Sequence, residues 1–434
     1  MIPIQAIKGR SHEAVLPLIL TLPTMSENLS IYTLANGIRV IHEEVASPIS
    51  HLGVIINAGT RDEADNLNDI AHFVEHTLFK GTTHRNSYQL TKRIENAGGE
   101  LNASTAKEET CFHASFLSAE YRHAFEILAD ILFHSTFPEK EIIKEKDVVL
   151  EEINYYKDTP AELIFDEIEE MAFAGHPLGR NILGSKQSLK RIGRQDILNF
   201  VKSQYTADHI VVASVGNLSH SSFLKYCNQY FNQPIAAQCA NSRSPFSHYS
   251  PTHLVKHKNT TQSHVMLCNT AFSFQEEGRL PLTLLTNLLG GQASSARLNV
   301  SIRERRGLAY TVEANYSPFT DSGLFTVYIG CDKEEVERCI DLTYKELQKL
   351  CTQKLGTIQL HTAQKQFIGQ LAITNEAKLN EMLSIGRSAL FFNEVETTES
   401  SFQKVEAITA DEILEAANRI FIPDQFSSLI YSGK

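Results

Sequence analysis

The feature that most constrains the fold is an internal repeat whose period is about half the chain. Residues Ile192–Phe200 can be aligned with Ile408–Ala416. After both stretches a predicted helix leads to a predicted strand that ends in glycine, at Gly216 and at Gly433. Because this period is far longer than that of a solenoid, the repeat indicates two domains of one fold, related by duplication.

The length of the chain supports the same division. At 434 residues the chain is too long for one ordinary core, and two domains of about 200 residues each are expected. Prolines and serines gather in the middle of the chain, which is typical of an interdomain linker. We predict an N-terminal extension over residues 1–24, a first domain over 25–232, a linker over 233–250 and a second domain over 251–434. Both domains are expected to be α+β, with helices packed on antiparallel sheets.

The composition argues against several classes of protein. No apolar run approaches the roughly 18 residues that a membrane span needs. The net charge of −11 argues against a nucleic-acid partner. The 7 cysteines are scattered and form no C-x-x-C pair, which is typical of a reducing compartment. We therefore predict a cytoplasmic protein with no membrane or nucleic-acid partner and no disulfide framework.

The stretch that carries chemistry is His72-Phe73-Val74-Glu75-His76. Its two histidines are four residues apart, so an α-helix places them on one face, within reach of one metal ion. Glu75 lies over the same face and is the candidate catalytic base. The order H-x-x-E-H is that of the inverted zincins. The motif arises by chance in roughly one such chain in twenty-five, so an amphipathic helix with two half-exposed histidines is the alternative.

A catalytic zinc ion usually takes three protein ligands, and the motif supplies two. The candidate for the third is Glu152, on a strongly charged helix expected over Glu139–Lys157. Glu145 lies seven residues earlier and therefore shares a face with Glu152. It would orient a metal ligand or help to move protons. The alternative for such a charged run is a solvated acidic face.

The second half contains a charged segment from Arg303 to Tyr310. Tyr310 would donate a hydrogen bond to a developing oxyanion, and Arg303 would hold the backbone or carboxylate of a substrate. A basic surface cluster is the plainer alternative.

In combination, these stretches resemble the pitrilysin family of zinc metallopeptidases, which includes insulin-degrading enzyme and mitochondrial processing peptidase. The chain is most similar to the short, processing-peptidase-like branch, and the resemblance runs from residue 25 to residue 434. The matching stretches are Gly59–Glu63, Ala71–His76 with Phe79–Thr82, Gly98–Thr105, Glu145–Ile153, His176–Gly179 and Arg303–Tyr310.

The resemblance implies a role for each motif residue. It implies that His72, His76 and Glu152 bind Zn²⁺, that Glu75 is the base and that Glu145 assists it. The expected activity is that of a zinc metalloendopeptidase.

The resemblance also implies how substrate is bound. Arg303 and Tyr310 would reach the active site across a clamshell from the other domain. Substrate would add in extended form to an edge strand that contains Asn102 and Ala103. The expected substrate is a small or unfolded peptide enclosed in a chamber, and the expected assembly is a homodimer.

Two alternatives remain open at this point. One is a non-catalytic structural relative, as in the core subunits of the respiratory bc1 complex. The other is the zinc-binding subunit of a heterodimeric peptidase. The chain also departs from the family pattern at Asp69, where glycine is frequent, and at Phe112, where tyrosine is frequent.

Overall fold

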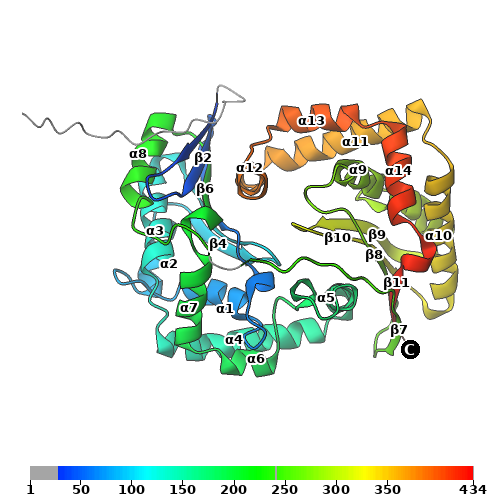
Figure 1. Cartoon of the computed structure of the whole chain (residues 1–434), viewed down its shortest axis with the longest axis horizontal. Helices are drawn as coiled ribbons and strands as arrows, with labels where there is room; N and C mark the ends of the chain where they lie inside the picture. The colour runs from blue at the N-terminus through cyan, green and yellow to red at the C-terminus, as the bar shows by residue number, and fades with distance from the viewer. Residues whose placement is uncertain (1–27, 240–241, 434) are drawn as a thin grey trace, which may run out of the picture.

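The computed structural model describes residues 28–239 and 242–433. The predicted extension over residues 1–24 therefore lies outside the described residues. Two sheets lie side by side, and helices cover each of them (Figure 1). This arrangement confirms the predicted α+β class with two related halves. No helix in the described ranges is both long enough and apolar enough to cross a membrane.

The first sheet is mostly antiparallel, with one parallel pair between β2 and β6. Helices α1, α3, α7 and α8 pack around it and share its main hydrophobic core. Its strands, in spatial order, are β1 (Leu29–Thr33), β2 (Arg39–Glu44), β6 (Ile210–Gly216), β3 (Ile49–Ile56), β5 (Thr110–Leu117) and β4 (Glu100–Thr105). The helices of this half are α1 (Ile70–Leu78), α2 (Ser87–Glu95), α3 (Tyr121–His134), α4 (Glu139–Lys157), α5 (Pro160–Ala172), α6 (Lys186–Arg191), α7 (Arg194–Gln204) and α8 (His220–Tyr230).

The second sheet repeats this pattern, with its one parallel pair between β7 and β11. In spatial order its strands are β7 (His253–His257), β11 (Ser427–Ser432), β8 (Ser263–Thr270), β10 (Gly323–Cys331) and β9 (Ala309–Pro318). Its helices are α9 (Arg279–Gly290), α10 (Val336–Thr352), α11 (Thr357–Glu376), α12 (Lys378–Phe392), α13 (Thr398–Ala407) and α14 (Ala410–Ile420).

The repeat seen in the sequence has a structural counterpart in α7 and α14. Each helix has 11 residues, and in each an acidic side chain in the first turn accepts from the main-chain amide of the N-cap residue, Asp196 in α7 and Glu412 in α14. Each leads through a short 3-10 turn into a strand, β6 or β11. Both strands lie between one parallel and one antiparallel neighbour. The two halves are therefore copies of one fold.

The two halves exchange one helix each. Helix α12 of the second half packs its buried Met382 and Ile385 on Ile55 and Ala213 of the first sheet. Helix α5 of the first half packs on the second sheet, where Ile168 belongs to a separate buried cluster. Figure 1 shows both helices beside the sheet of the other half. Because each sheet packs against a helix from the other half, buried apolar contacts at two places hold the halves together.

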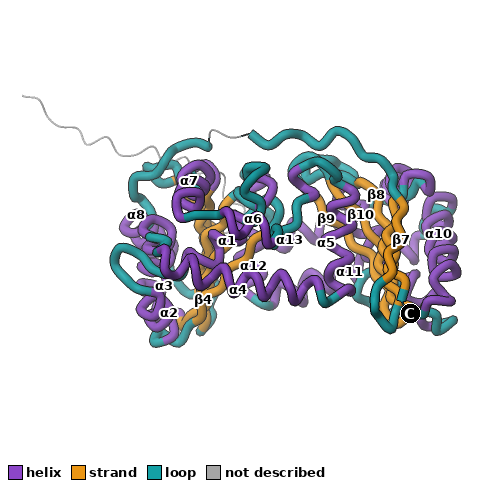
Figure 2. The backbone as a smooth tube through the Cα atoms, turned by 90° about the horizontal axis from the view of Figure 1, so that it is seen from below, coloured by secondary structure: helices purple, strands orange, loops and turns teal. Residues whose placement is uncertain are grey.

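Polar contacts hold the halves together as well. Arg61 is buried, and its guanidinium bonds Glu108 at 2.6 Å in the first half and Asp321 at 2.7 Å in the second. The main chain of Thr320 donates to Glu108 at 2.9 Å. The described part of the predicted linker has no helix or strand, and Figure 2 shows it running from one half to the other. The domain limits 25–232 and 251–434 remain a prediction.

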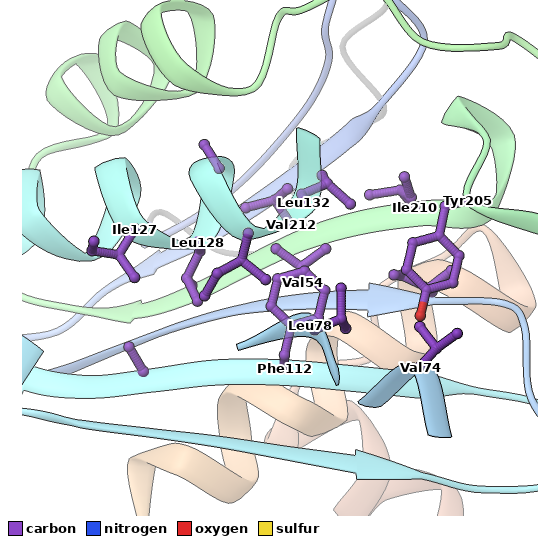
Figure 3. Packing of buried hydrophobic residues seen from close by; sticks show 14 of the residues in the cluster. Val54, Val74, Leu78, Phe112, Ile127, Leu128, Leu132, Tyr205, Ile210 and Val212 are labelled. Carbon is purple, nitrogen blue, oxygen red and sulfur yellow. The ribbon is translucent and has the colours of Figure 1, made fainter. Parts of the chain in front are cut away.

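Helix α1 is anchored in the first core by its apolar residues. Its Val74 and Leu78 lie with Val54, Phe112 and Tyr205 in one buried cluster (Figure 3). Since these side chains point into the core, the histidine-bearing face of the helix is turned away from it.

Candidate active site

The helix that carries the histidines begins in an unusual conformation. Asp69 precedes α1 with φ at 89°, the left-handed region that few residues other than glycine adopt. The Glu63 carboxylate accepts hydrogen bonds from the main-chain amides of Asp69 at 3.1 Å and Ala71 at 3.0 Å. An added Cβ on Gly184 would lie 2.3 Å from the Cβ of Asp69, so only glycine fits there. A left-handed backbone favours glycine, so an aspartate here is unusual, and Gly184 makes room for its side chain.

Three candidate metal ligands converge at the face of α1. The Nε2 atoms of His72 and His76 lie 3.1 Å apart. Oε2 of Glu152 lies 3.7 Å from Nε2 of His72 and 3.3 Å from Nε2 of His76. Ligands about 2.0–2.1 Å from a tetrahedral zinc ion are separated by about 3.3 Å. The three atoms therefore have the spacing of a zinc site.

Carboxylates fix the orientation of both histidine rings. Nδ1 of His76 contacts Oε1 of Glu145 at 3.1 Å, and Nδ1 of His72 contacts Oδ1 of Asp69 at 3.3 Å. These contacts place a proton on each Nδ1, so the lone pairs of both Nε2 atoms point into the space between the two rings. A cation in that space would relieve the repulsion between the lone pairs. Glu145 also receives a 2.7 Å ion pair from Lys80.

The pKa values show that this place favours positive charge. Burial opposes protonation of His76, but its hydrogen bonds with Glu145 and Glu152 outweigh burial and raise its pKa to about 9. Burial and the neighbouring His76 lower the pKa of His72. The hydrogen bond with His76 holds the pKa of Glu152 below its usual value. A proton at His76 thus occupies the position that a metal ion would take, and the donor set fits zinc.

Glu75 stands between two pockets. One, of about 460 Å³, is lined by Glu75, His76, Phe79 and Glu145 among others. The other, of about 290 Å³, is lined by Glu75 together with His72 and Glu152. Glu75 makes no hydrogen bond with another described residue, so its carboxylate is available to a bound molecule.

The predicted edge strand borders both pockets. Strand β4 lies at the end of the first sheet and pairs only with β5 among the described strands. Ala103 lines both pockets, and Asn102 lines the larger one. The main-chain amide of Ala103 donates to the side chain of Asn102 at 2.8 Å, so it is not used within the sheet. An extended chain laid along β4 would take this amide and pass Glu75.

The structure does not bring Arg303 and Tyr310 to this site. Arg303 is exposed in the π-helical turn η5 (Asn299–Glu304), and Tyr310 is 59% exposed near the start of β9. Neither residue lines either pocket. The structure therefore shows no contact between this pair and the pockets in the first half of the same chain.

Sequence reasoning assigned no role to three residues that shape the site, which are Glu63, Asp69 and Lys80. Glu63 and Lys80 lie inside the matching stretches, and Lys80 is four residues after His76, just beyond the end of α1 at Leu78. That spacing is a usable signal for Lys80. Nothing local in the sequence indicates that Glu63 caps a helix that begins seven residues later.

Comparison with family profiles agrees with these observations. The profile described as insulinase (peptidase family M16) matches residues 39–186. The profile described as peptidase M16 inactive domain matches residues 191–367. Together the two profiles cover both the histidine motif and the segment around Arg303.

Relatives and solved structures extend the likeness over nearly the whole chain. The uncharacterized zinc protease YmxG of Bacillus subtilis (strain 168) is 31% identical over 401 residues, which cover 92% of this chain and 97% of that protein. An uncharacterized zinc protease of Rickettsia bellii is 30% identical over 407 residues, covering 94% and 98%. A crystal structure of a peptidase M16 inactive domain from Pseudomonas fluorescens has a TM-score of 0.87 at 20% identity, covering 94% of this chain and 98% of that one. A protease from Helicobacter pylori has a TM-score of 0.84 at 20% identity, covering 94% and 99%. The chain therefore belongs to peptidase family M16, the pitrilysin family.

Proposed function

We propose that this protein is a zinc-dependent endopeptidase that cleaves small or unfolded peptides in extended form. The observation that carries the proposal is the triangle of His72, His76 and Glu152, whose ligand atoms lie 3.1–3.7 Å apart. When bound there, zinc lowers the pKa of a water molecule toward about 7 and polarises a peptide carbonyl.

The residues of the chain supply the proton transfers. Glu75 shares both pockets with the metal ligands and makes no hydrogen bond with a described residue. It accepts the proton of the attacking water and delivers it to the leaving amine. Glu145 holds His76 in place through a contact of 3.1 Å with its Nδ1, and Lys80 holds Glu145 through an ion pair of 2.7 Å.

Substrate lies along β4, with one pocket on each side of Glu75. The amide of Ala103 donates to the side chain of Asn102 and not within the sheet, so a substrate that displaces that side chain gains a main-chain hydrogen bond that does not depend on its sequence. Because the substrate adds to this edge as an extended strand, a peptide or an unfolded segment fits it best.

The assembly is a homodimer that encloses the substrate in a chamber. Arg303 and Tyr310 are exposed and line neither pocket of their own chain. In the proposed two-fold dimer the second half of one copy faces the first half of the other, so each site receives the pair from the partner. Arg303 then holds the substrate backbone, and Tyr310 donates to the developing oxyanion. This is the arrangement expected for a processing-peptidase-like enzyme.

Elemental analysis combined with a peptide-library digest tests the proposal. The purified protein should hold about one tightly bound zinc per chain, and a zinc chelator should abolish cleavage until zinc is restored. His76→Ala should lose both this zinc and cleavage. A wild-type protein that binds zinc but cleaves no peptide would support a non-catalytic structural role instead.

A further inference from the structure

A second cluster of metal-binding side chains lies outside the active site. His84 stands in the loop between α1 and α2, and Asp130 and His134 belong to the last turns of α3. One ligand atom from each of the three lies within 4.8 Å of the other two. We propose that His84, Asp130 and His134 form a second site for a divalent transition-metal ion.

The cluster repeats the device used by the histidine motif. Asp130 and His134 are four residues apart on α3, so they lie on one helix face, one turn apart. The third ligand comes from another element, as Glu152 does in the active site. Two imidazoles and one carboxylate form a donor set that suits Zn²⁺, Cu²⁺ or Ni²⁺ better than Mg²⁺ or Ca²⁺.

The loop that carries His84 is fixed to the end of α3. The amide of Thr83 donates to the carbonyl of His134 at 2.9 Å, and the amide of Thr136 donates to the carbonyl of Gly81 at 2.9 Å. The rings of His84 and His134 lie 4.8 Å apart and perpendicular. The ligands are therefore brought together by the main chain before any ion arrives.

The polar contacts of the cluster leave room for a metal ion. Nδ1 of His84 contacts Oδ1 of Asp130 at 2.7 Å, and the ring of His134 makes no hydrogen bond with a described residue. The other oxygen, Oδ2, accepts from Thr82 at 2.9 Å and from Arg85 at 2.6 Å. Arg85 and Thr82 thus hold the carboxylate from behind, while Oδ1 faces the two histidines. The spacing of about 3.3 Å between zinc ligands requires His84 to move away from Asp130, and its side chain, which is 56% exposed, is free to do so.

An ion at this cluster would act on the segment that follows the catalytic helix. The loop that holds His84 begins at Gly81, directly after Lys80, which supports Glu145 and lines the larger pocket. Binding an ion only in the folded state stabilises that state. Occupancy therefore fastens the loop to α3 and steadies the lysine beside the active site.

Zinc stoichiometry in full-length variants tests the inference. After equilibration with micromolar zinc, wild-type protein should hold two zinc ions per chain, and His84→Ala should hold one. His84 is exposed, so the variant should unfold at the wild-type temperature when zinc is removed. His123→Ala is the matched control, because His123 lies on α3 with Asp130 and His134 and its ring contacts Glu120 at 2.6 Å. It should keep two ions.

The active-site variant separates this inference from the proposed function. His76→Ala should keep one zinc ion, and His76→Ala combined with His84→Ala should keep none. A wild-type protein that takes up a single zinc ion, or a His84→Ala variant that still holds two, would overturn the second site. Retention of both ions by His76→Ala would instead contradict the active-site assignment.

Discussion

Helices α1 and α9 occupy equivalent places in the two halves, and their side chains show how the two copies differ. Strand β3 leads to α1 and β8 leads to α9, and the edge strands β4 and β9 close the two sheets in the same way. Helix α1 turns His72 and His76 toward two pockets. Helix α9 buries Leu282, Leu285 and Leu289 and carries no histidine. One scaffold thus supports two roles, because chemistry depends on a few side chains on one helix face.

The approach to each helix differs as well. Before α1 the chain places the buried acids Glu63 and Asp69, and burial raises the pKa of Asp69 to about 9. Before α9 it places Gly278 in a right-handed conformation, where an added Cβ would lie 2.4 Å from Phe272. The first half therefore buries polar groups, which is unfavourable, in order to position its histidines. The second half fills the equivalent position with apolar side chains.

Glu75→Gln gives the largest expected loss of activity and tests whether α1 alone carries the chemistry. The amide keeps the size of the side chain but cannot accept the proton, so kcat should fall about 10²–10⁴-fold while zinc is retained. Steady-state kinetics and elemental analysis measure the two effects. Glu151→Gln, an exposed neighbour of the proposed ligand Glu152, is the control and should be unaffected. Wild-type turnover by Glu75→Gln would place the base elsewhere, with Glu145 next in line.

Tyr310→Phe tests whether the second half contributes to the reaction. The change removes one hydrogen-bond donor that acts on the transition state, so kcat and kcat/KM should fall together by about 10–1000-fold. Zinc content and thermal stability should stay at the wild-type values, since Tyr310 is exposed. An unchanged kcat would return Tyr310 to the role of a surface residue.

Lys80→Ala tests whether the ion pair that holds Glu145 supports the proposed metal ligands. Helix α9, which carries no such ligands, does not require this support. Loss of the 2.7 Å ion pair with Glu145 frees the carboxylate that orients His76. Zinc affinity, measured by competition with a chelator, should fall about 10–100-fold. The control is Lys144→Ala, whose exposed side chain pairs with Glu141 on α4 at 2.8 Å. Equal zinc affinity in the two variants would contradict a supporting role for Lys80.

Met382→Ala and Ile168→Ala compare the exchanged helices and should affect catalysis least. Each side chain is fully buried on the sheet of the other half. Each substitution should lower the free energy of unfolding by about 2–5 kcal/mol in urea titrations. Zinc binding should persist in both. A loss confined to one of the two variants would show that the exchanged helices are not equivalent.

The sequence was sufficient for features that depend on local spacing. The four-residue separation of His72 and His76 predicted a shared helix face, and the seven-residue separation of Glu145 and Glu152 predicted a second one. The structure brings all four side chains together. Duplication was also visible, because the capping residues and strand ends of the two copies recur in order.

Features that depend on distant contacts were not predictable from spacing. The exchange places α5 on β8, which follows it by about 90 residues, and α12 on β3, which precedes it by more than 300 residues. From the sequence, each helix would be assigned to its own half. The left-handed Asp69 could not be anticipated, because its conformation depends on Gly184 and on the acid that caps α1.

Mixing two inactive variants tests most directly the claim that the halves of two copies complete one site. One variant carries Glu75→Gln, and the other carries Arg303→Ala with Tyr310→Phe. In random two-fold dimers about a quarter of the sites unite an intact Glu75 with an intact pair from the partner. Peptide cleavage should therefore recover to about a quarter of the wild-type rate after subunit exchange. No recovery in a mixture that size-exclusion chromatography shows to be dimeric would contradict the account.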